Sequence, residues 1–163
     1  MSKTKRMTTI TMLIAISIVF HMVESMIPVP MIVPGFKLGL ANVVGLVALY
    51  LFDGKVMFEV NLMRVVFASL LRGMIFGTGF WLSLTGIILS STACILAKRY
   101  TPMTMYGVSV CGSCFHAIGQ VIAVTVIYQQ FFMQAVLPFL IVLGIPTGLC
   151  IALFAKQVTA RLK

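Results

Sequence analysis

Apolar runs fill almost the whole chain, separated only by short polar or proline-containing gaps. Of the 163 residues, 61% are hydrophobic and 9% are charged, whereas about a quarter are charged in a typical soluble domain. A helix needs about 20 apolar residues to cross a bilayer, and six such runs leave no room for a soluble catalytic domain. We therefore predict an all-α fold, a polytopic six-helix bundle in which residues 1–163 form a single integral membrane domain. The expected spans are approximately residues 8–27, 38–52, 56–71, 74–96, 105–128 and 132–154.

Basic residues are concentrated on one side of the predicted bundle. With a cytoplasmic N-terminus, both tails and the gaps at 53–55 and 98–102 face inward, and together they carry nine of the twelve Lys and Arg residues. Cytoplasmic loops are enriched in Lys and Arg, so both termini are expected in the cytoplasm. The net charge of +9 then reflects topology and attraction to anionic lipid, and it does not indicate a nucleic-acid partner. The nine residues are Lys3, Lys5, Arg6, Lys55, Lys98, Arg99, Lys156, Arg161 and Lys163.

The N-terminal segment and the cysteines have ordinary interpretations. Residues 1–6 and the following apolar run resemble a signal peptide, but no small-x-small cleavage motif follows, so we predict a retained first span. Cys111 and Cys114 stand close to His116, yet an apolar helix disfavours the thiolates that redox or metal chemistry needs. We therefore predict no metal site. Small residues are expected to let helices approach closely, along the stripe Gly79, Ser83, Gly86, Ser90 and Cys94 and along the stripe Gly107, Cys111 and Cys114.

One face of the third span carries unusual polar residues. Asn61, Arg64, Ala68 and Arg72 follow the spacing i, i+3, i+7 and i+11, which places them on one side of a helix. An arginine that faces lipid in mid-span costs at least about 3 kcal/mol, so Arg64 is expected to face the bundle interior. Two interpretations stay open for it: an internal ion pair, with Glu24 as the candidate partner, or a cation in a ligand cavity. For Arg72, near the outer end, snorkelling at the interface is an equally good explanation.

Further polar residues are expected in the outer half of the bundle. Lys37 lies in the outer gap before the second span, and Asn42 lies near the start of that span. His116 and Gln120 share a face near the middle of the fifth span, although His116 alone could be a hydrogen-bonded packing residue. Together these groups predict an outward-facing pocket beneath segment 28–35, whose three prolines exclude a regular helix. Three cations against one carboxylate favour an anionic or acceptor-bearing ligand. The predicted ligand-binding residues are Lys37, Asn42, Arg64, Arg72, His116 and Gln120.

The sequence lacks the residues that catalysis would need. No Gly-x-x-x-x-Gly-Lys-Ser/Thr motif is present, so nucleotide hydrolysis by that route is not expected. Magnesium-assisted diphosphate chemistry needs several carboxylates around the metal ions, and the chain has only three acidic residues, widely separated. We therefore predict that the chain is not an enzyme by itself and carries no cofactor.

Several motifs resemble those of a family of small bacterial membrane proteins. They are Pro34-Gly-Phe-Lys-Leu-Gly-Leu-Ala-Asn42, Leu62-Met-Arg64, Leu71-Arg-Gly73 and Phe115-His-Ala-Ile-Gly-Gln120. They are similar to the Gx transporter family, whose members are often labelled heptaprenyl diphosphate synthase component I. That family is similar to the substrate-binding (S) components of energy-coupling factor transporters, six-helix proteins that bind vitamins in an outward-facing pocket. The resemblance implies a location in the bacterial plasma membrane, a loop at 28–37 over the pocket, and ATPase and coupling membrane subunits as partners.

Two functions follow as hypotheses. The first is a substrate-binding integral membrane component of an uptake system, driven by partner subunits, for a vitamin-, quinone- or isoprenoid-precursor-like molecule. The second is a non-catalytic membrane accessory subunit in menaquinone or isoprenoid metabolism, or in flavin- or quinone-linked electron export. In that case a soluble prenyl synthase would be the expected partner.

Overall fold

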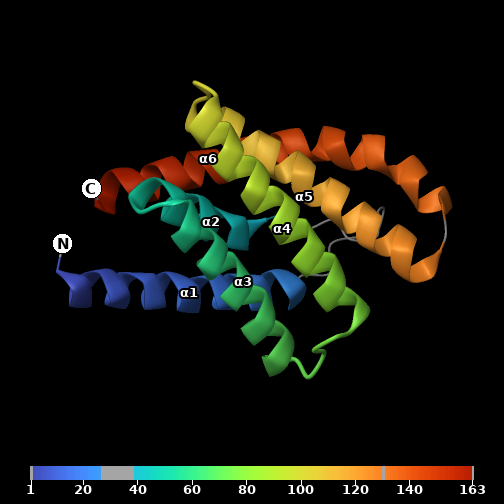
Figure 1. Ribbon diagram of the computed structural model, residues 1–163, viewed down its shortest axis with the longest axis horizontal. Coiled ribbons are helices and arrows are strands. Elements are labelled where there is room, and N and C mark those ends of the chain that lie inside the picture. The colour runs from blue at the N-terminus through green and yellow to red at the C-terminus, as the bar shows by residue number, and fades with distance from the viewer. Residues whose placement is uncertain (1, 27–38, 130, 163) are drawn as a thin grey trace.

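The computed structural model describes residues 2–26, 39–129 and 131–162, and these are helical almost throughout. The prediction of an all-α helical bundle is confirmed, and each expected span corresponds to one α-helix (Figure 1). Segment 28–35 and Lys37 lie outside the described residues. The helices are α1 (Lys3–Met26), α2 (Leu40–Leu51), α3 (Gly54–Leu71), α4 (Thr78–Tyr100), α5 (Met105–Tyr128) and α6 (Leu137–Leu162), with a short 3-10 helix, η1 (Phe131–Val136), before α6.

The first helix begins five residues earlier than expected, at Lys3, and the fourth and sixth differ from their expected bounds at both ends. The fourth begins at Thr78 instead of residue 74, because the chain turns through Gly73 and Phe76, which both adopt the left-handed conformation (φ 63° and 64°). It also continues past residue 96 to include Lys98 and Arg99 in its last turn, where positive charge interacts favourably with the helix dipole. The sixth helix begins later than residue 132, after η1, and runs on to Leu162.

Four helical segments are long and apolar enough to cross a membrane: α1, α4, α5 and the segment Gln134–Leu162 that contains α6. By contrast, α2 has 12 residues, a length of about 18 Å, which is less than the roughly 30 Å of a hydrocarbon core. The remaining helix, α3, has 18 residues but carries Lys55, Glu59 and Arg64. The chain is therefore a membrane protein with four membrane-capable segments, and α2 and α3 complete the bundle.

The six helices form a closed ring. Going around it, α1 packs on α2, α2 on α6, α6 on α5, α5 on α4, α4 on α3, and α3 again on α1, while α2 and α3 also touch each other. In Figure 1 the α4–α5–α6 side and the α1–α3 side can be followed as the two halves of this arrangement. The space inside the ring is where side chains from all six helices can meet.

Small residues bring α4, α5 and α6 close together. On α4, Ser83, Gly86, Ser90 and Cys94 are buried as predicted, whereas a Cβ on Gly79 would meet nothing within 4 Å. On α5 the closest approaches among the glycines occur at Gly112 and Gly119, whereas a Cβ on Gly107 of the predicted stripe would meet only Met103, at 3.4 Å or more. A Cβ on Gly119 would lie 2.7 Å from the Thr85 carbonyl oxygen, and one on Gly112 would lie 2.4 Å from Cys94 Sγ.

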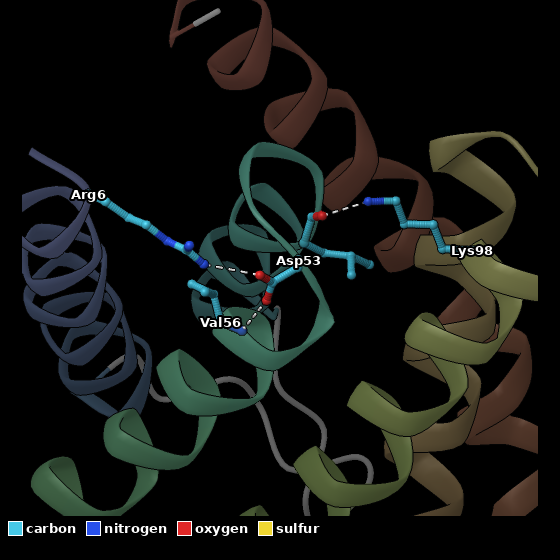
Figure 2. A network of polar contacts seen from close by, with 5 residues as sticks. Arg6, Asp53, Val56 and Lys98 are labelled. Atoms are coloured by element: carbon cyan, nitrogen blue, oxygen red, sulfur yellow. Dashed lines mark hydrogen bonds and ion pairs between the residues drawn. The ribbon is translucent and has the colours of Figure 1, made fainter. Parts of the chain in front are cut away.

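The basic segments gather at one end of the bundle, where both termini lie (Figure 1). Arg6 pairs with Asp53 across 3.1 Å, and Asp53 also accepts a hydrogen bond from the Val56 backbone N–H at the start of α3. Lys98 donates to the Leu49 carbonyl oxygen at the end of α2, over 2.7 Å (Figure 2). The predicted topology requires this common end, and its cytoplasmic orientation stays a prediction.

Candidate functional site

A cavity at the centre of the ring is lined by residues from all six helices. Its volume is about 50 Å³, enough for about three or four water molecules. Polar groups project into it from α1, α2, α3, α4, α5 and α6, beside a smaller number of apolar side chains. The lining residues are His21, Glu24, Gly39, Asn42, Arg64, Ser83, Ile87, Ser113, His116, Ala117, Gln120, Leu140, Gly144, Thr147 and Ile151.

The inward face of α1 becomes polar as it approaches the cavity. The buried residues of this helix are Leu13, Ser17, His21 and Glu24, whose spacing of four, four and three residues keeps them on one face. On the other side, large apolar side chains such as Val19 remain more than half exposed, as expected for a lipid-facing surface. A membrane helix has polar residues on its buried face and apolar residues on its exposed face when the polar residues face the bundle interior.

Arg64 is the most constrained side chain of the cavity. Only 2% of its surface is exposed, and its Nη2 donates a hydrogen bond to Oδ1 of Asn42 at 3.0 Å. Its Nε and Nη1 atoms are buried and have no hydrogen-bond partner among the described residues. Leaving buried charged donors unsatisfied is costly, so these two N–H groups are suited to an acceptor that enters the cavity.

Glu24 lies in the same cavity but is engaged elsewhere. Its Oε1 accepts a short hydrogen bond from the Gly39 backbone N–H, which holds the end of α1 against the start of α2. The carboxylate attracts the Arg64 guanidinium electrostatically. However, no ion pair within 4 Å joins Glu24 to Arg64, both of which belong to the described part of the chain. Glu24 therefore balances the charge of Arg64 without occupying its free N–H groups.

Two residues of α5 complete the polar lining. His116 and Gln120 are one helical turn apart and both face the cavity, as their spacing predicts. The His116 ring packs against Gly86 of α4, where a Cβ would come within 2.7 Å of its Cε1 atom. The Gln120 side chain is 6% exposed, and its amide offers a donor and an acceptor to the cavity.

The structure brings four of the six predicted ligand-binding residues together: Asn42, Arg64, His116 and Gln120. Arg72 does not line the cavity. It is the exposed residue that follows α3, and it borders a neighbouring hollow that shares His21 and Ser83 with the cavity. Lys37 lies outside the described residues.

Sequence reasoning missed His21. It lies three residues before Glu24 and is 8% exposed, so the helical spacing from Glu24 could have found it. It also missed the hydroxyl groups of Ser83, Ser113 and Thr147, which line the cavity but whose small side chains look like packing residues in a membrane helix.

The chemistry available in the cavity is recognition by hydrogen bonds and charge. Among the described residues, no group of three or more His, Cys, Asp or Glu side chains is arranged to hold a metal ion. The cysteines are free thiols, and none of them lines the cavity. A guanidinium with unused donors next to amide, imidazole and hydroxyl groups is a binding arrangement for a carboxylate, phosphate or carbonyl oxygen.

Comparison with known families identifies the relatives of the chain. The family described as heptaprenyl diphosphate synthase component I matches residues 13–158, which is 146 of the 163 residues. The chain belongs to this family. The range matched to the heptaprenyl diphosphate synthase component I family contains every residue that lines the cavity. No curated protein and no solved structure gave a significant match.

Proposed function

We propose that the protein is a membrane component that binds a small anionic or acceptor-bearing molecule in the central cavity. The observation that carries this proposal is the pair of buried Arg64 N–H groups without a hydrogen-bond partner in the described residues. A bound acceptor would satisfy both of them. Such a requirement is hard to explain for a purely structural arginine, since buried charges are normally fully hydrogen-bonded.

The size of the cavity limits which part of the ligand it holds. Sites for whole drug-sized molecules have volumes of about 300–1,000 Å³, whereas this cavity has about 50 Å³. A cavity of this volume suits a single carboxylate, phosphate or quinone carbonyl group beside Arg64, and the rest of a vitamin- or quinone-like ligand would need the cavity to widen. Binding would therefore be accompanied by a rearrangement of the ring of helices.

The leading role for such a site is uptake. In this proposal both termini are cytoplasmic, ligand enters from the outer side, and partner ATPase and coupling membrane subunits supply the energy for release inside. The polar cavity lies away from the basic end of the bundle, toward the end of α1 that carries Glu24. With the basic end in the cytoplasm, the cavity would be nearer to the outer surface.

The family match favours a second candidate function. The family is described as component I of heptaprenyl diphosphate synthase, and a component I implies a partner subunit. In this role the chain would be a non-catalytic membrane subunit that binds a lipophilic isoprenoid or quinone precursor for a soluble prenyl synthase. The cavity would then recognise the polar end of that molecule.

The decisive experiment is affinity purification of the tagged protein in mild detergent, followed by mass spectrometry of the bound proteins and of the extracted small molecules. Arg64→Met removes the guanidinium at similar volume, and Arg161→Met in the last turn of α6 is the charge-matched control. Co-purified ATPase and coupling subunits with a polar ligand support uptake, and a prenyl synthase with an isoprenoid or quinone supports the accessory role. A ligand retained equally by wild type, Arg64→Met and Arg161→Met would show that the cavity is not the binding site.

A further inference from the structure

A second hollow lies at the basic end of the bundle, away from the central cavity. It is an open groove of about 740 Å³ between the α2–α3 turn and the last turns of α4. None of its lining residues also lines the central cavity. A ligand in this groove would therefore bind independently of Arg64.

The groove is positively charged, because its basic side chains outnumber its acidic ones and one of the acidic side chains is already paired with an arginine. Lys55, Lys98 and Arg99 border it together with Asp53 and Glu59. Asp53 is already neutralised by Arg6 and bonded to the Val56 N–H (Figure 2). Lys98 is partly engaged with the Leu49 carbonyl oxygen, so Lys55 and Arg99 are the exposed cations that remain for a ligand.

The surroundings reinforce this charge. The described part of the basic end holds eight Lys and Arg residues against two carboxylates, a balance of 8 − 2 = +6, because the third acidic residue of the chain, Glu24, lies in the central cavity. The eight are Lys3, Lys5, Arg6, Lys55, Lys98, Arg99, Lys156 and Arg161. A partner of opposite charge is the one that this end of the molecule would attract.

The other half of the groove is apolar. Leu49, Phe52, Phe58 and Ile95 line it beside the cations. This combination lies at the end of the membrane-capable helix α4, where a bilayer has its boundary between acyl chains and headgroups. A ligand that fits both halves has a phosphate group for the cations and a hydrocarbon chain for the apolar wall.

We propose that this groove binds the headgroup and the first part of the chain of a phosphate-bearing amphiphile. Two sources offer this chemistry: an anionic phospholipid of the surrounding leaflet, and a prenyl diphosphate. An acidic segment of a partner protein would match the charge but would not need an apolar wall at membrane level. The shared chemistry is a phosphate or diphosphate linked to a hydrocarbon tail.

The test uses the purified full-length protein in neutral phosphatidylcholine nanodiscs, with phosphatidylglycerol and farnesyl diphosphate as separate probes. The groove variant is Lys55→Gln/Arg99→Gln, and the control is Lys3→Gln/Lys5→Gln, which removes the same charge at the same end but outside the groove. We expect about tenfold weaker probe binding in the groove variant and little change in the control, since each basic side chain near a membrane surface contributes appreciably to the attraction of anionic lipid.

The pattern of binding identifies the source and can overturn the proposal. Binding of phosphatidylglycerol alone assigns the groove to phospholipid, and displacement of that lipid by farnesyl diphosphate assigns it to prenyl diphosphates. Equal weakening in both variants would mean diffuse surface charge, and no weakening in either would mean no site. Inorganic diphosphate competing as well as farnesyl diphosphate would exclude a role for the apolar wall. Arg64→Met should leave groove binding unchanged, so failure of either site can be told from failure of the other.

Discussion

The Nη2 atom of Arg64 donates a hydrogen bond to the Oδ1 atom of Asn42, 3.0 Å away, and this bond joins α3 to α2 beside the central cavity. This bond fixes the orientation of the guanidinium. Its Nε and Nη1 atoms then have no hydrogen-bond acceptor among the described residues. An arginine positioned in this way is pre-organised for an acceptor, because little further side-chain entropy is lost when the acceptor binds.

Replacing Arg64 should separate binding from stability. Arg64→Met should weaken ligand binding about a hundredfold, since two charge-assisted hydrogen bonds contribute about 3 kcal/mol or more. The same variant should lose at most about 1 kcal/mol of stability, because the removal of buried donors without partners offsets the loss of the hydrogen bond to Asn42 and of the charge that balances Glu24. Thermal unfolding in detergent and ligand binding on the same samples measure both effects. A variant that loses stability by several kcal/mol would indicate a structural role.

Gly86 should control the position of His116. Its replacement by Ala places a Cβ 2.7 Å from the imidazole Cε1 atom, and overpacking of this kind typically costs about 1–3 kcal/mol. We expect weaker ligand binding together with a lower unfolding temperature. Gly79→Ala is the matched control on the same helix, because its Cβ meets nothing within 4 Å. Equal behaviour of the two variants in unfolding and binding assays would contradict the packing described for His116.

Asp53 should stabilise the basic end mainly as the N-cap of α3. Its side chain accepts a hydrogen bond from the Val56 N–H at 2.9 Å, and loss of such a cap costs about 1 kcal/mol. The ion pair with Arg6 is half exposed on both sides, so it should add little. Asp53→Ala is therefore expected to lower the free energy of unfolding by about 1 kcal/mol more than Arg6→Met. If Arg6→Met were the more destabilising change in denaturant titrations, the ion pair would be the dominant interaction.

Cysteine labelling tests the predicted topology. In a background in which Cys94, Cys111, Cys114 and Cys150 are replaced by Ala, Lys5→Cys should react with a membrane-impermeant maleimide only after cells are permeabilised. Arg72→Cys, at the opposite end of α3 from the Asp53 turn, should react in intact cells. The reverse pattern would invert the topology and would place the basic end outside.

The sequence predicted the helices and the inward face of α3 for identifiable reasons. Apolar runs bounded by polar turns determine the number of helices, and the high cost of exposing Asn61 and Arg64 to lipid determines which face turns inward. Both residues are 4% or less exposed. The ends of the helices were less predictable. The start of α4 depends on the left-handed turn at Gly73 and Phe76, and the hydropathy of this segment does not indicate such a turn.

The choice among small residues on α5 could not be made from the sequence. Gly107 is as small as Gly112 and Gly119, and Cys111 and Cys114 also belong to the small residues that pack in membrane helices, so residue size does not tell which face packs most closely. Only the position of α4, whose backbone approaches Gly119, selects the face. The gathering of His21 with residues of α3 and α5 also depends on closure of the helix ring, which no local pattern encodes.

Every helix contributes residues to the one cavity. If the chain is cut into two fragments, the site can therefore form only when both fragments are present. Cutting the chain in the turn between α3 and α4 leaves Glu24, Asn42 and Arg64 on one fragment and His116 and Gln120 on the other. Neither fragment should retain ligand alone, whereas co-expressed fragments should do so if they associate. The ligand would then hold the two fragments together, and their resistance to separation would rise with its concentration.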